Sequence, residues 1–529
     1  MDKNQWWIRA TPELFFDNHL IEMVQDVRRV FHSPVKRLDP LITRDSSWEA
    51  YLSFNDAAWN VIHDVSEGVF RCWYEDAHFD FKRIGQTNVD ITDPRVSGSR
   101  VCYATSPDGL NWIKPRLELM PVSGRPTNIV FGDWNEGQAH FGAVHAISVL
   151  DDRLHSDVTT RFKMLFQHIT RASPITDVVT DTGQVHEVLQ SPIRLASSPD
   201  GIHWRVDDHQ LDFGGLGPRL GDVIRLTRDW NTGEYLLYTR HPNAWNPLLN
   251  PKNPHSRAWS LPYYPEDPAK NNKRRIWLCQ SWDLLHWSEP QEVLIPDDTD
   301  DNLDESFNAL GMLRIGNVRV GFLNVLHMVD GTADVQLVHS RDGVHWQRAP
   351  HRKSFLSTGA MDDWDAYMVS MPTAPIEHGD ELWLYYGGAN LHHNWWLVGR
   401  REGLDLPEVY RPTEFSSGMG LAVLRKEGFV SLNATIREGI VVTRPVRLAG
   451  WPLLFNVRCR SGGYLDVEIV DADDNVIPGY LRSNFQRFAG DSTRSLLQWQ
   501  GSPTIPLDRP VKLRFFMRHC DVYSVCTAF

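Results

Sequence analysis

Four stretches of the chain repeat one seven-residue phrase: Ser106-Pro-Asp-Gly-Leu-Asn-Trp112, Ser198-Pro-Asp-Gly-Ile-His-Trp204, Ser281-Trp-Asp-Leu-Leu-His-Trp287 and Ser340-Arg-Asp-Gly-Val-His-Trp346. A phrase that recurs in this way indicates a repeat architecture. Its Asp-Gly pair favours a tight turn with positive φ, the next aliphatic residue restarts a strand, and the Trp packs on a neighbour. Each copy therefore predicts a hairpin at the outer edge of one repeat unit.

Runs rich in β-branched and aromatic residues precede each copy. The nearer runs are residues 100–104, 192–196, 275–279 and 335–339, and the farther runs are 69–74, 162–166, 234–238 and 318–322. A fifth unit has runs at 381–386 and 420–424, followed by a degenerate turn at 426–430. Four strands in each of five units predict an all-β chain with a five-bladed β-propeller over residues 46–433.

Both ends of the chain have a different pattern. The repeated phrase is absent from residues 434–529, which instead contain short strand-like runs of alternating hydrophobic and polar residues. This pattern predicts a C-terminal β-sandwich. Residues 1–45 are expected to be a lead-in segment that packs on the propeller, with a weakly helical pattern at 13–31. The Asp-rich turn at 471–475 could hold a structural calcium ion, but it lacks the full loop signature, so a solvated turn is favoured.

Composition excludes several classes of function. The 529 residues are 42% hydrophobic and 23% charged, as in a globular protein, and the net charge of −13 without a basic tract argues against a nucleic-acid partner. The six cysteines lack metal-ligand spacing, so free thiols and no metal site are expected. No run of 18 apolar residues or signal-like N-terminus occurs, which predicts no membrane partner and a cytoplasmic chain, or a secreted or periplasmic one whose signal has been removed. The oligomeric state stays open.

The first strand of each propeller blade lines a central channel, where side chains from all blades converge. The runs expected there are residues 56–62, 140–146, 222–226, 305–310 and 365–369. Four begin with a carboxylate and one with a histidine: Asp56, His140, Asp222, Glu305 and Asp365. Glycoside hydrolysis needs two carboxyl groups on either side of the scissile bond. We therefore expect Asp56 to act as nucleophile or base and Glu305 or Asp222 as the general acid, with Asp365 and His140 binding substrate.

Further polar residues are placed near this channel by the same reasoning. Arg240 and His241 close the second strand of the third unit, and His327 has the matching place in the fourth; they could bind sugar hydroxyls or a substrate carboxylate. Glu49 precedes the first channel strand, and His393 lies in a loop after the fifth unit's second strand. For any one of these positions, a turn, capping or surface role is the alternative.

The repeated turns followed by a sandwich resemble the five-bladed propeller glycoside hydrolases of the invertase/inulinase-like and arabinanase-like families. The chain is most similar to bacterial glycosyl hydrolase family 32-like proteins, through residues 16–21 (Phe-Asp-Asn-His-Leu-Ile), the Gly490-Asp491-Ser492 triplet and Trp499. This resemblance implies hydrolysis of furanosides or pentosides, with Asp56 matching the carboxylate of the first blade. The invertase signatures are absent, and the chain has His140 and Asp222 where the family has an Asp and a Glu.

The function expected from the sequence is a glycoside hydrolase that acts on furanoside-type bonds of oligosaccharides, without an organic cofactor. A non-catalytic carbohydrate-binding propeller would use the same aromatic residues without paired acids. A transglycosylase or a lyase is a further alternative, and a lyase would need a cation-rich subsite for a uronate, such as a cluster of Arg240, His241, His327 and His393. A protein-interaction scaffold ranks last.

Overall fold

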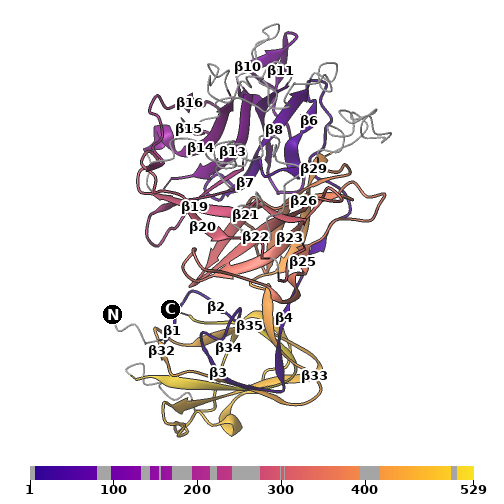
Figure 1. The fold of residues 1–529 in the computed structure, drawn as a ribbon. Coiled ribbons are helices and arrows are strands. Elements are labelled where there is room, and N and C mark those ends of the chain that lie inside the picture. Colours follow the sequence, from indigo (N-terminus) through magenta and orange to yellow (C-terminus); the bar gives the residue numbers. More distant parts are fainter. Residues whose placement is uncertain are drawn as a thin grey trace.

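The computed structural model describes residues 6–79, 97–132, 143–153, 157–169, 193–214, 223–240, 274–297, 299–302, 304–393, 417–501 and 509–528. Over these residues the protein is all-β, and its described helices are the short 3₁₀ turns η1 (Ser53–Asn55), η2 (Val158–Thr160), η5 (Pro350–Arg352) and η7 (Arg482–Asn484). No described helix is long and apolar enough to cross a membrane. Figure 1 shows an upper part that contains β6 to β29 and a lower part in which strands from both ends of the chain meet.

The described strands of the upper part can be grouped in chain order into sets that are called units 1 to 5, and neighbouring strands within each set are antiparallel. Unit 1 contains β6 (Tyr51–Leu52), β7 (Trp59–Asp64), β8 (Val69–Phe79), β9 (Ser97–Ser106) and β12 (Ile129–Phe131), with the hairpin β10 (Leu117–Val122) and β11 (Arg125–Thr127) beside it. Unit 2 contains β13 (Ala143–Asp151), β14 (Phe162–Ile169), β15 (Ile193–Ser198) and β16 (Arg205–Val206). Unit 3 contains β17 (Ile224–Arg228), β18 (Tyr235–Arg240), β19 (Ile276–Ser281) and β20 (Gln291–Leu294).

Units 4 and 5 share one sheet through a parallel bridge between Ala333 and Met368. Unit 4 contains β21 (Glu305–Ile315), β22 (Val318–His327), β23 (Thr332–Ser340), β24 (Trp346–Arg348) and β25 (Ser354–Leu356). Unit 5 contains β26 (Met368–Ser370), β27 (Ile376–His378), β28 (Glu381–Ala389) and β29 (Ser417–Arg425), and its outermost strand is β5 (Val35–Lys36) from the N-terminal side of the chain. The runs rich in β-branched and aromatic residues lie in these second and third strands, as expected from their composition.

The repeated turns have one shared geometry. In the first copy, the Ser106 hydroxyl accepts the Gly109 N–H at 2.9 Å, and the Asp108 carboxylate accepts the N–H groups of Leu110 and Asn111 at 2.8 and 2.7 Å. The other three copies repeat these bonds. The glycine has positive φ in three copies (Gly109 +74°, Gly201 +79°, Gly343 +83°), which confirms the turn predicted from the Asp-Gly pairs.

Each of these three glycine turns contacts the second strand of a neighbouring unit. A Trp or Tyr side chain on that strand donates a hydrogen bond to the glycine carbonyl. The pairs are Trp73 of unit 1 with Gly201 of unit 2 (2.7 Å), Tyr238 of unit 3 with Gly343 of unit 4 (3.1 Å), and Tyr385 of unit 5 with Gly109 of unit 1 (2.9 Å). Unit 5 therefore contacts unit 1, although they are far apart in the sequence.

The turn of unit 3 replaces the glycine with Leu284, which has positive φ (+68°). Leu165 occupies in unit 2 the position that Trp73 occupies in unit 1. In each unit, this residue pairs with the residue that lies three positions before the serine of the repeated phrase. Leu165 and Leu284 belong to one buried cluster. The turn with Leu284 therefore packs in the same cluster as Leu165 of the neighbouring unit. The three turns with glycine instead contact a Trp or Tyr side chain that donates a hydrogen bond.

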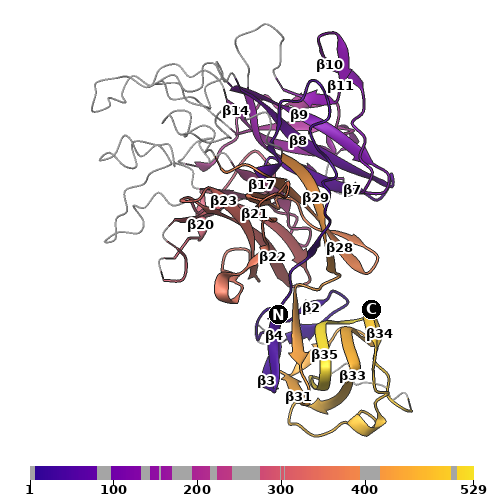
Figure 2. The ribbon, with the colours of Figure 1, turned by 90° about the vertical axis from the view of Figure 1, so that its right-hand side faces the viewer.

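Ten described strands form one sheet in the lower part. Its C-terminal strands are β30 (Val430–Ala434), β31 (Gly439–Thr443), β32 (Val446–Leu448), β33 (Leu453–Asp471), β34 (Asp491–Leu496) and β35 (Val511–Thr527). Its N-terminal strands are β1 (Trp6–Ile8), β2 (Glu13–Leu14), β3 (Ile21–Gln25) and β4 (Val27–Phe31), which pair with β32, β35, β31 and β30. Both ends of the chain lie in this part in two views (Figures 1 and 2).

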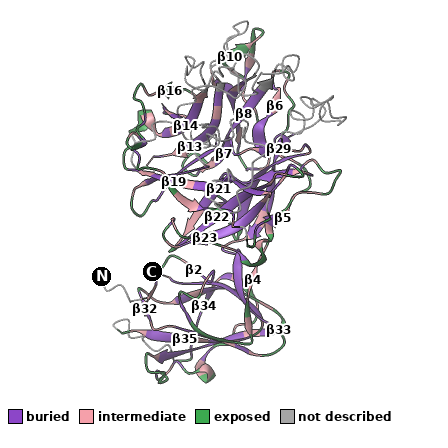
Figure 3. Cartoon of the chain, in the orientation of Figure 1, coloured by how far each residue is buried: buried purple, intermediate pink, exposed green. Residues whose placement is uncertain are grey.

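The helical pattern expected at residues 13–31 was wrong, because these residues form β2, β3 and β4. The expected packing of the N-terminal segment on the upper part is also incomplete. Leu14 and Phe16 do pack into the core of units 4 and 5, but Phe15 points into the core of the lower sheet. This alternation follows from the two-residue period of an extended chain. The segment thus joins two cores, and buried residues line the strands of both parts (Figure 3).

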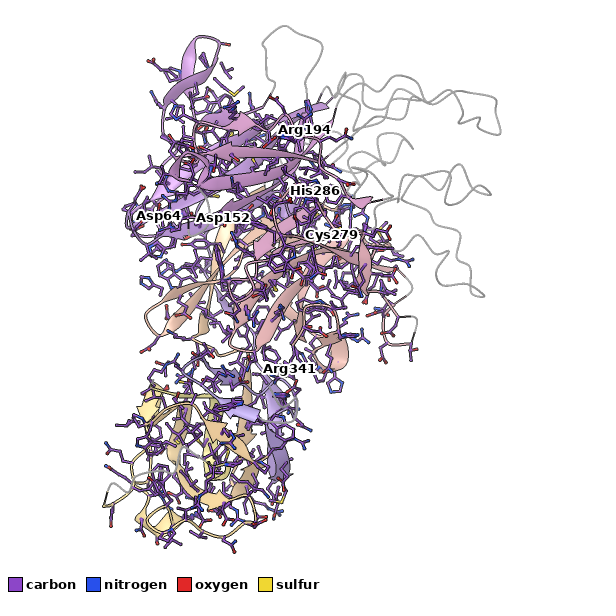
Figure 4. The ribbon with its side chains drawn as sticks, turned by 90° about the vertical axis from the view of Figure 1, so that its left-hand side faces the viewer. Asp64, Asp152, Arg194, Cys279, His286 and Arg341 are labelled. Atoms are coloured by element: carbon purple, nitrogen blue, oxygen red, sulfur yellow. The ribbon has the colours of Figure 1, made fainter. Side chains whose placement is uncertain are left out.

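Asp17 links this segment to unit 4. Its two carboxylate oxygens each lie 2.8 Å from a nitrogen of the Arg341 guanidinium, and Arg341 lies where the two parts meet (Figure 4). Burial acts against the charged form, but the hydrogen bonds and charge of Arg341 outweigh it and lower the pKa of Asp17 to about 2. The ionised Asp17 therefore stabilises the junction.

Asp17→Asn is expected to lower the free energy of unfolding by about 1–2 kcal/mol at neutral pH, after allowance for the partial exposure of the pair. Because the folded-state pKa lies below the unfolded value of about 3.9, this contribution is complete above that value and disappears as the pH falls towards 2. Urea denaturation at pH 7 and at pH 3 measures the difference. Asp39→Asn, at an exposed position, is the control, and an equal loss in both variants would contradict the prediction.

Candidate functional site

Asp56 lies where the five units meet. It follows η1 and precedes β7 by three residues, and it is partly exposed. The Ser370 hydroxyl of unit 5 lies 2.7 Å from the Phe54 carbonyl oxygen and 3.1 Å from that of Asp56. A Cβ atom on Gly387 would lie 1.7 Å from the Phe54 carbonyl oxygen, so only glycine lets β28 approach η1 this closely. Unit 5 therefore fixes the backbone that carries Asp56.

Arginines of unit 3 lie close enough to interact electrostatically with Asp56. Arg240 ends β18 and Arg274 precedes β19, and each donates a hydrogen bond to the same Asn308 Oδ1 atom, at 2.9 and 2.8 Å. The Asn308 Nδ2 group lies 3.5 Å from Asp56 Oδ1. Burial is the main cause that lowers the pKa of Arg240 well below its usual value, and the charge of Arg274 adds to it. Asn308 thus connects two buried guanidinium groups to one carboxylate.

A β-bulge directs Asn308 towards this centre. Phe307 pairs with Val325 and Ala309 pairs with Asn324, so Asn308 is an extra residue on β21. A bulge changes the direction of one side chain without ending the strand. Because the strand on either side stays regular, Asn308 reaches the centre while its neighbours remain in the core.

Arg225 contacts the backbone of the neighbouring units close to Asp56. Its guanidinium donates to the carbonyl oxygens of Trp59 in unit 1, at 3.1 Å, and of Ile147 in unit 2. Burial lowers the pKa of Arg225 to about 9, although the Asp56 charge acts in the opposite direction. Arg225 therefore ties three units together next to Asp56.

Two histidines lie beside the same carboxylate. His145 Nδ1 is 2.8 Å from Glu75 Oε1; burial opposes its protonation, but the Glu75 carboxylate outweighs burial and raises its pKa. His393 is the opposite case, because burial and the charges of Arg274 and Arg240 lower its pKa to about 3. At neutral pH, His393 is therefore neutral, and it can donate and accept hydrogen bonds.

Glu305 and His327, both expected from the sequence, lie together at the start of unit 4. His327 Nδ1 is 3.8 Å from Glu305 Oε1, and its Nε2 atom is 3.4 Å from Asp334. Asn302 donates a 2.8 Å hydrogen bond to Glu305 Oε1, whereas the buried Oε2 atom accepts no hydrogen bond from the described residues. Burial raises the pKa of Glu305. A carboxyl group with a raised pKa keeps its proton to a higher pH, as a proton donor must.

If Glu305 is the proton donor, kcat/KM should fall on the alkaline side of its pH profile as Glu305 loses its proton. Because its pKa is raised, this fall lies above the usual glutamate value of about 4.3. Glu305→Gln is expected to remove this fall and to lower kcat by about 10²–10⁴-fold for substrates with poor leaving groups, with a smaller loss for nitrophenyl substrates. Unequal losses on the two substrate types support the role, and equal losses contradict it.

The contacts of two other expected residues favour structural roles. Glu49 accepts hydrogen bonds from Tyr74 at 2.9 Å and from Lys114 at 2.8 Å, so both of its oxygens are engaged within unit 1. Asp365 lies 2.6 Å from Lys36 Nζ and 3.0 Å from the Tyr386 hydroxyl, so it binds the outermost strand of unit 5. Asp56 and Asp365 each precede their strand by three residues, whereas Glu305 begins β21.

The structure brings Asp56, Arg240 and His393 together. Asp222, His140 and His241 lie outside the described residues. The sequence analysis did not select Arg225, Arg274, His145 or Asn308. Three of them, Arg225, His145 and Asn308, are polar residues inside the apolar runs expected to line the channel, and that position was the available signal. Among the described residues, no group of three or more His, Cys, Asp or Glu is arranged to hold a metal ion.

Searches for known relatives found similarity only among solved structures. No family model and no curated protein matches the chain. A similar structure is an N-acetylgalactosamine deacetylase from F. plautii in complex with blood group B trisaccharide (12% identity, 77% of this chain and 97% of that one, TM-score 0.43). Others are a glycosyl hydrolase from Bacteroides ovatus (13%, 75% and 94%, 0.42) and β-1,2-mannobiose phosphorylase from Listeria innocua with β-1,2-mannobiose (13%, 76% and 97%, 0.41). At this similarity, the function must be argued from the site itself.

Proposed function

We propose that the protein is a glycoside hydrolase whose reaction centre is Asp56, on a five-bladed β-propeller followed by a β-sandwich. The observation that carries this proposal is the convergence of side chains from all five units on one partly exposed carboxylate. The contributors are Asp56 of unit 1, His145 of unit 2, Arg225, Arg240 and Arg274 of unit 3, Asn308 of unit 4, and His393 of unit 5. The contact between units 5 and 1 supports a closed ring of blades.

In this proposal Asp56 attacks the anomeric carbon or activates a water molecule. Glu305 donates a proton to the leaving oxygen, because its carboxyl has a raised pKa. Asp222 stays an alternative proton donor. Arg240 and His393 bind the sugar, and a furanoside-type bond in an oligosaccharide is the expected target. Two carboxyl groups with different protonation states are what glycoside hydrolysis needs.

One observation favours a second candidate, which is a lyase that acts on a uronate. Such an enzyme needs cations to neutralise the substrate carboxylate and a base to remove a proton, and three guanidinium groups lie beside Asp56. A lyase product contains a new double bond and absorbs in the ultraviolet. A hydrolase product has a new reducing end without this absorbance.

The test is a screen of aryl furanosides, aryl pyranosides and oligosaccharides with the wild type, Asp56→Asn and Glu305→Gln. Reducing ends and ultraviolet absorbance are measured in parallel. Hydrolysis of oligosaccharides that is lost in both variants, with the fold intact by circular dichroism, would support the proposal. Activity that neither variant changes would contradict the site, and ultraviolet-absorbing products would favour the lyase.

A further inference from the structure

Two cysteines lie opposite each other on long strands of the lower part. Cys459 of β33 pairs with Cys520 of β35, and their Sγ atoms are 3.2 Å apart. Both strands lie in the lower part of the molecule, away from the five units that carry Asp56 (Figure 1). The two cysteines are 61 residues apart in the sequence, so the folded sheet brings them together. All six cysteines of the chain are free thiols in this structure.

The backbone places the two cysteines at a separation that a disulfide can span. The Cys459 N–H donates a 2.7 Å hydrogen bond to the Gly490 carbonyl, on the side of β33 that faces β34 rather than β35. Cys459 and Cys520 therefore form a non-hydrogen-bonded antiparallel pair, in which the Cα atoms are about 4.5 Å apart. Disulfides join Cα atoms that are about 4.4–6.8 Å apart. Rotation of the side chains alone can therefore bring the two sulfur atoms to bonding distance.

An ion pair directly after the cysteines holds the two strands in this register. Arg460 follows Cys459 and Asp521 follows Cys520, and Arg460 Nη2 lies 2.7 Å from Asp521 Oδ2. Regular pairing of β33 with β35 stops at the cysteines and resumes at Tyr464. A covalent bond at this point would therefore fix the register where the pairing is interrupted.

The two thiols differ in access and in acidity. Cys459 is half-buried, whereas Cys520 is buried. The contact with Cys520 is the main cause that lowers the pKa of the Cys459 thiol, although burial opposes it. The same contact and burial raise the pKa of Cys520. Because the thiolate is the attacking species in thiol–disulfide exchange, Cys459 is the residue of the pair that reacts first with an external oxidant.

The other four cysteines are placed differently. All four are buried. Strand pairing also puts a residue other than cysteine opposite each of them: Ala104 opposite Cys72, Tyr74 opposite Cys102, Leu237 opposite Cys279 and Leu454 opposite Cys526. The structure therefore singles out one pair of the six thiols for oxidation.

We propose that Cys459 and Cys520 form a reversible disulfide that ties β33 to β35 under oxidising conditions. The oxidant is a small disulfide such as oxidised glutathione. The Cys459 thiolate attacks one sulfur atom of this oxidant, which breaks its S–S bond and releases one glutathione. The Cys520 sulfur then attacks Cys459 Sγ and releases the second glutathione. The two protein thiols are oxidised to one disulfide, and their two protons end on the two glutathione thiols. This inference does not depend on the proposed function.

The first test counts thiols in the full chain. The protein is incubated with oxidised glutathione, denatured, treated with a maleimide and weighed by mass spectrometry. The wild type should lose two of its six reactive thiols, and a digest should contain one peptide pair joined through Cys459 and Cys520. Cys526→Ser, which removes a buried cysteine of the same strand β35, is the matched control and should lose two thiols as well. Dithiothreitol should restore the lost thiols in both proteins.

The two site variants distinguish the steps of the reaction. Cys520→Ser should keep one glutathione on Cys459, because the second thiol is missing. Cys459→Ser should lose no thiol, because Cys520 is buried. A wild type that keeps six thiols, one that carries glutathione on Cys459 without the crosslink, or a crosslink through another cysteine would overturn the inference.

The second test measures what the disulfide does to the fold. The bond closes a loop of about 60 residues in the unfolded chain, which lowers the entropy of the unfolded state. The melting temperature of the oxidised wild type should therefore exceed that of the reduced wild type by roughly 5–10 °C. Cys459→Ser should melt at one temperature with and without the oxidant. An equal rise in this variant, or a crosslinked wild type without a rise, would contradict the stabilising role of the bond.

Discussion

Asp56→Asn should lower kcat by about 10²–10⁴-fold on whichever glycoside the wild type cleaves, because an amide is a poor nucleophile and a poor base. The substitution keeps the size of the side chain, and it leaves the Asp56 carbonyl near Ser370 and the backbone of η1 unchanged. The melting temperature should therefore change much less than the activity.

The control for this variant is Asp208→Asn, at an exposed loop position outside the site. It should have the kinetics of the wild type. Full activity in Asp56→Asn would remove Asp56 from the mechanism. Loss of activity together with a change of the fold by circular dichroism would instead mean that Asp56 has a structural role.

Gly201→Ala is expected to lower the free energy of unfolding by about 2–4 kcal/mol. Part of the cost is the left-handed backbone, since φ is +79° and a Cβ atom is disfavoured there. The rest is steric, because the new Cβ would lie 2.5 Å from Cζ2 of the buried Trp73 ring in the neighbouring unit. Urea denaturation monitored by tryptophan fluorescence measures the change.

Gly68→Ala separates the two costs. Gly68 also has positive φ (+65°), but nothing lies within 4 Å of a Cβ built there. This variant should lose only about 1 kcal/mol, from the backbone alone. Equal losses at the two positions would mean that the contact between units 1 and 2 contributes nothing at Gly201.

The strands and turns of the upper part could be predicted because each follows from local chemistry. Ser106, Asp108 and Gly109 fix their turn by bonds within four residues, so the phrase alone determines it. Residues 13–31 could not be assigned in this way, because β2, β3 and β4 depend on partners about 400 or more residues away. Local periodicity carries no information about such pairing.

The candidate site was predicted only in part, for a related reason. Asp56 was selected because it precedes a buried strand, and that position depends on sequence alone. Asn308 reaches the centre through a bulge, and Arg274 reaches it from a residue that precedes β19. The direction of these side chains is set by register and by neighbouring strands. The sequence analysis expected a ring of carboxylates, whereas the described residues around Asp56 are mainly arginines and histidines.

The pairing of β1 to β4 with β30 to β35 also constrains how the protein is made. The ribosome releases β4 roughly 400 residues before β30, an interval of about 20–80 s at ordinary rates of synthesis. During that interval the early strands have unpaired edges, which are prone to aggregate with other chains. A nascent chain that stalls after unit 5 would have five nearly complete units and an N-terminal segment without its partners. Such a product should depend on chaperones far more than the finished protein does.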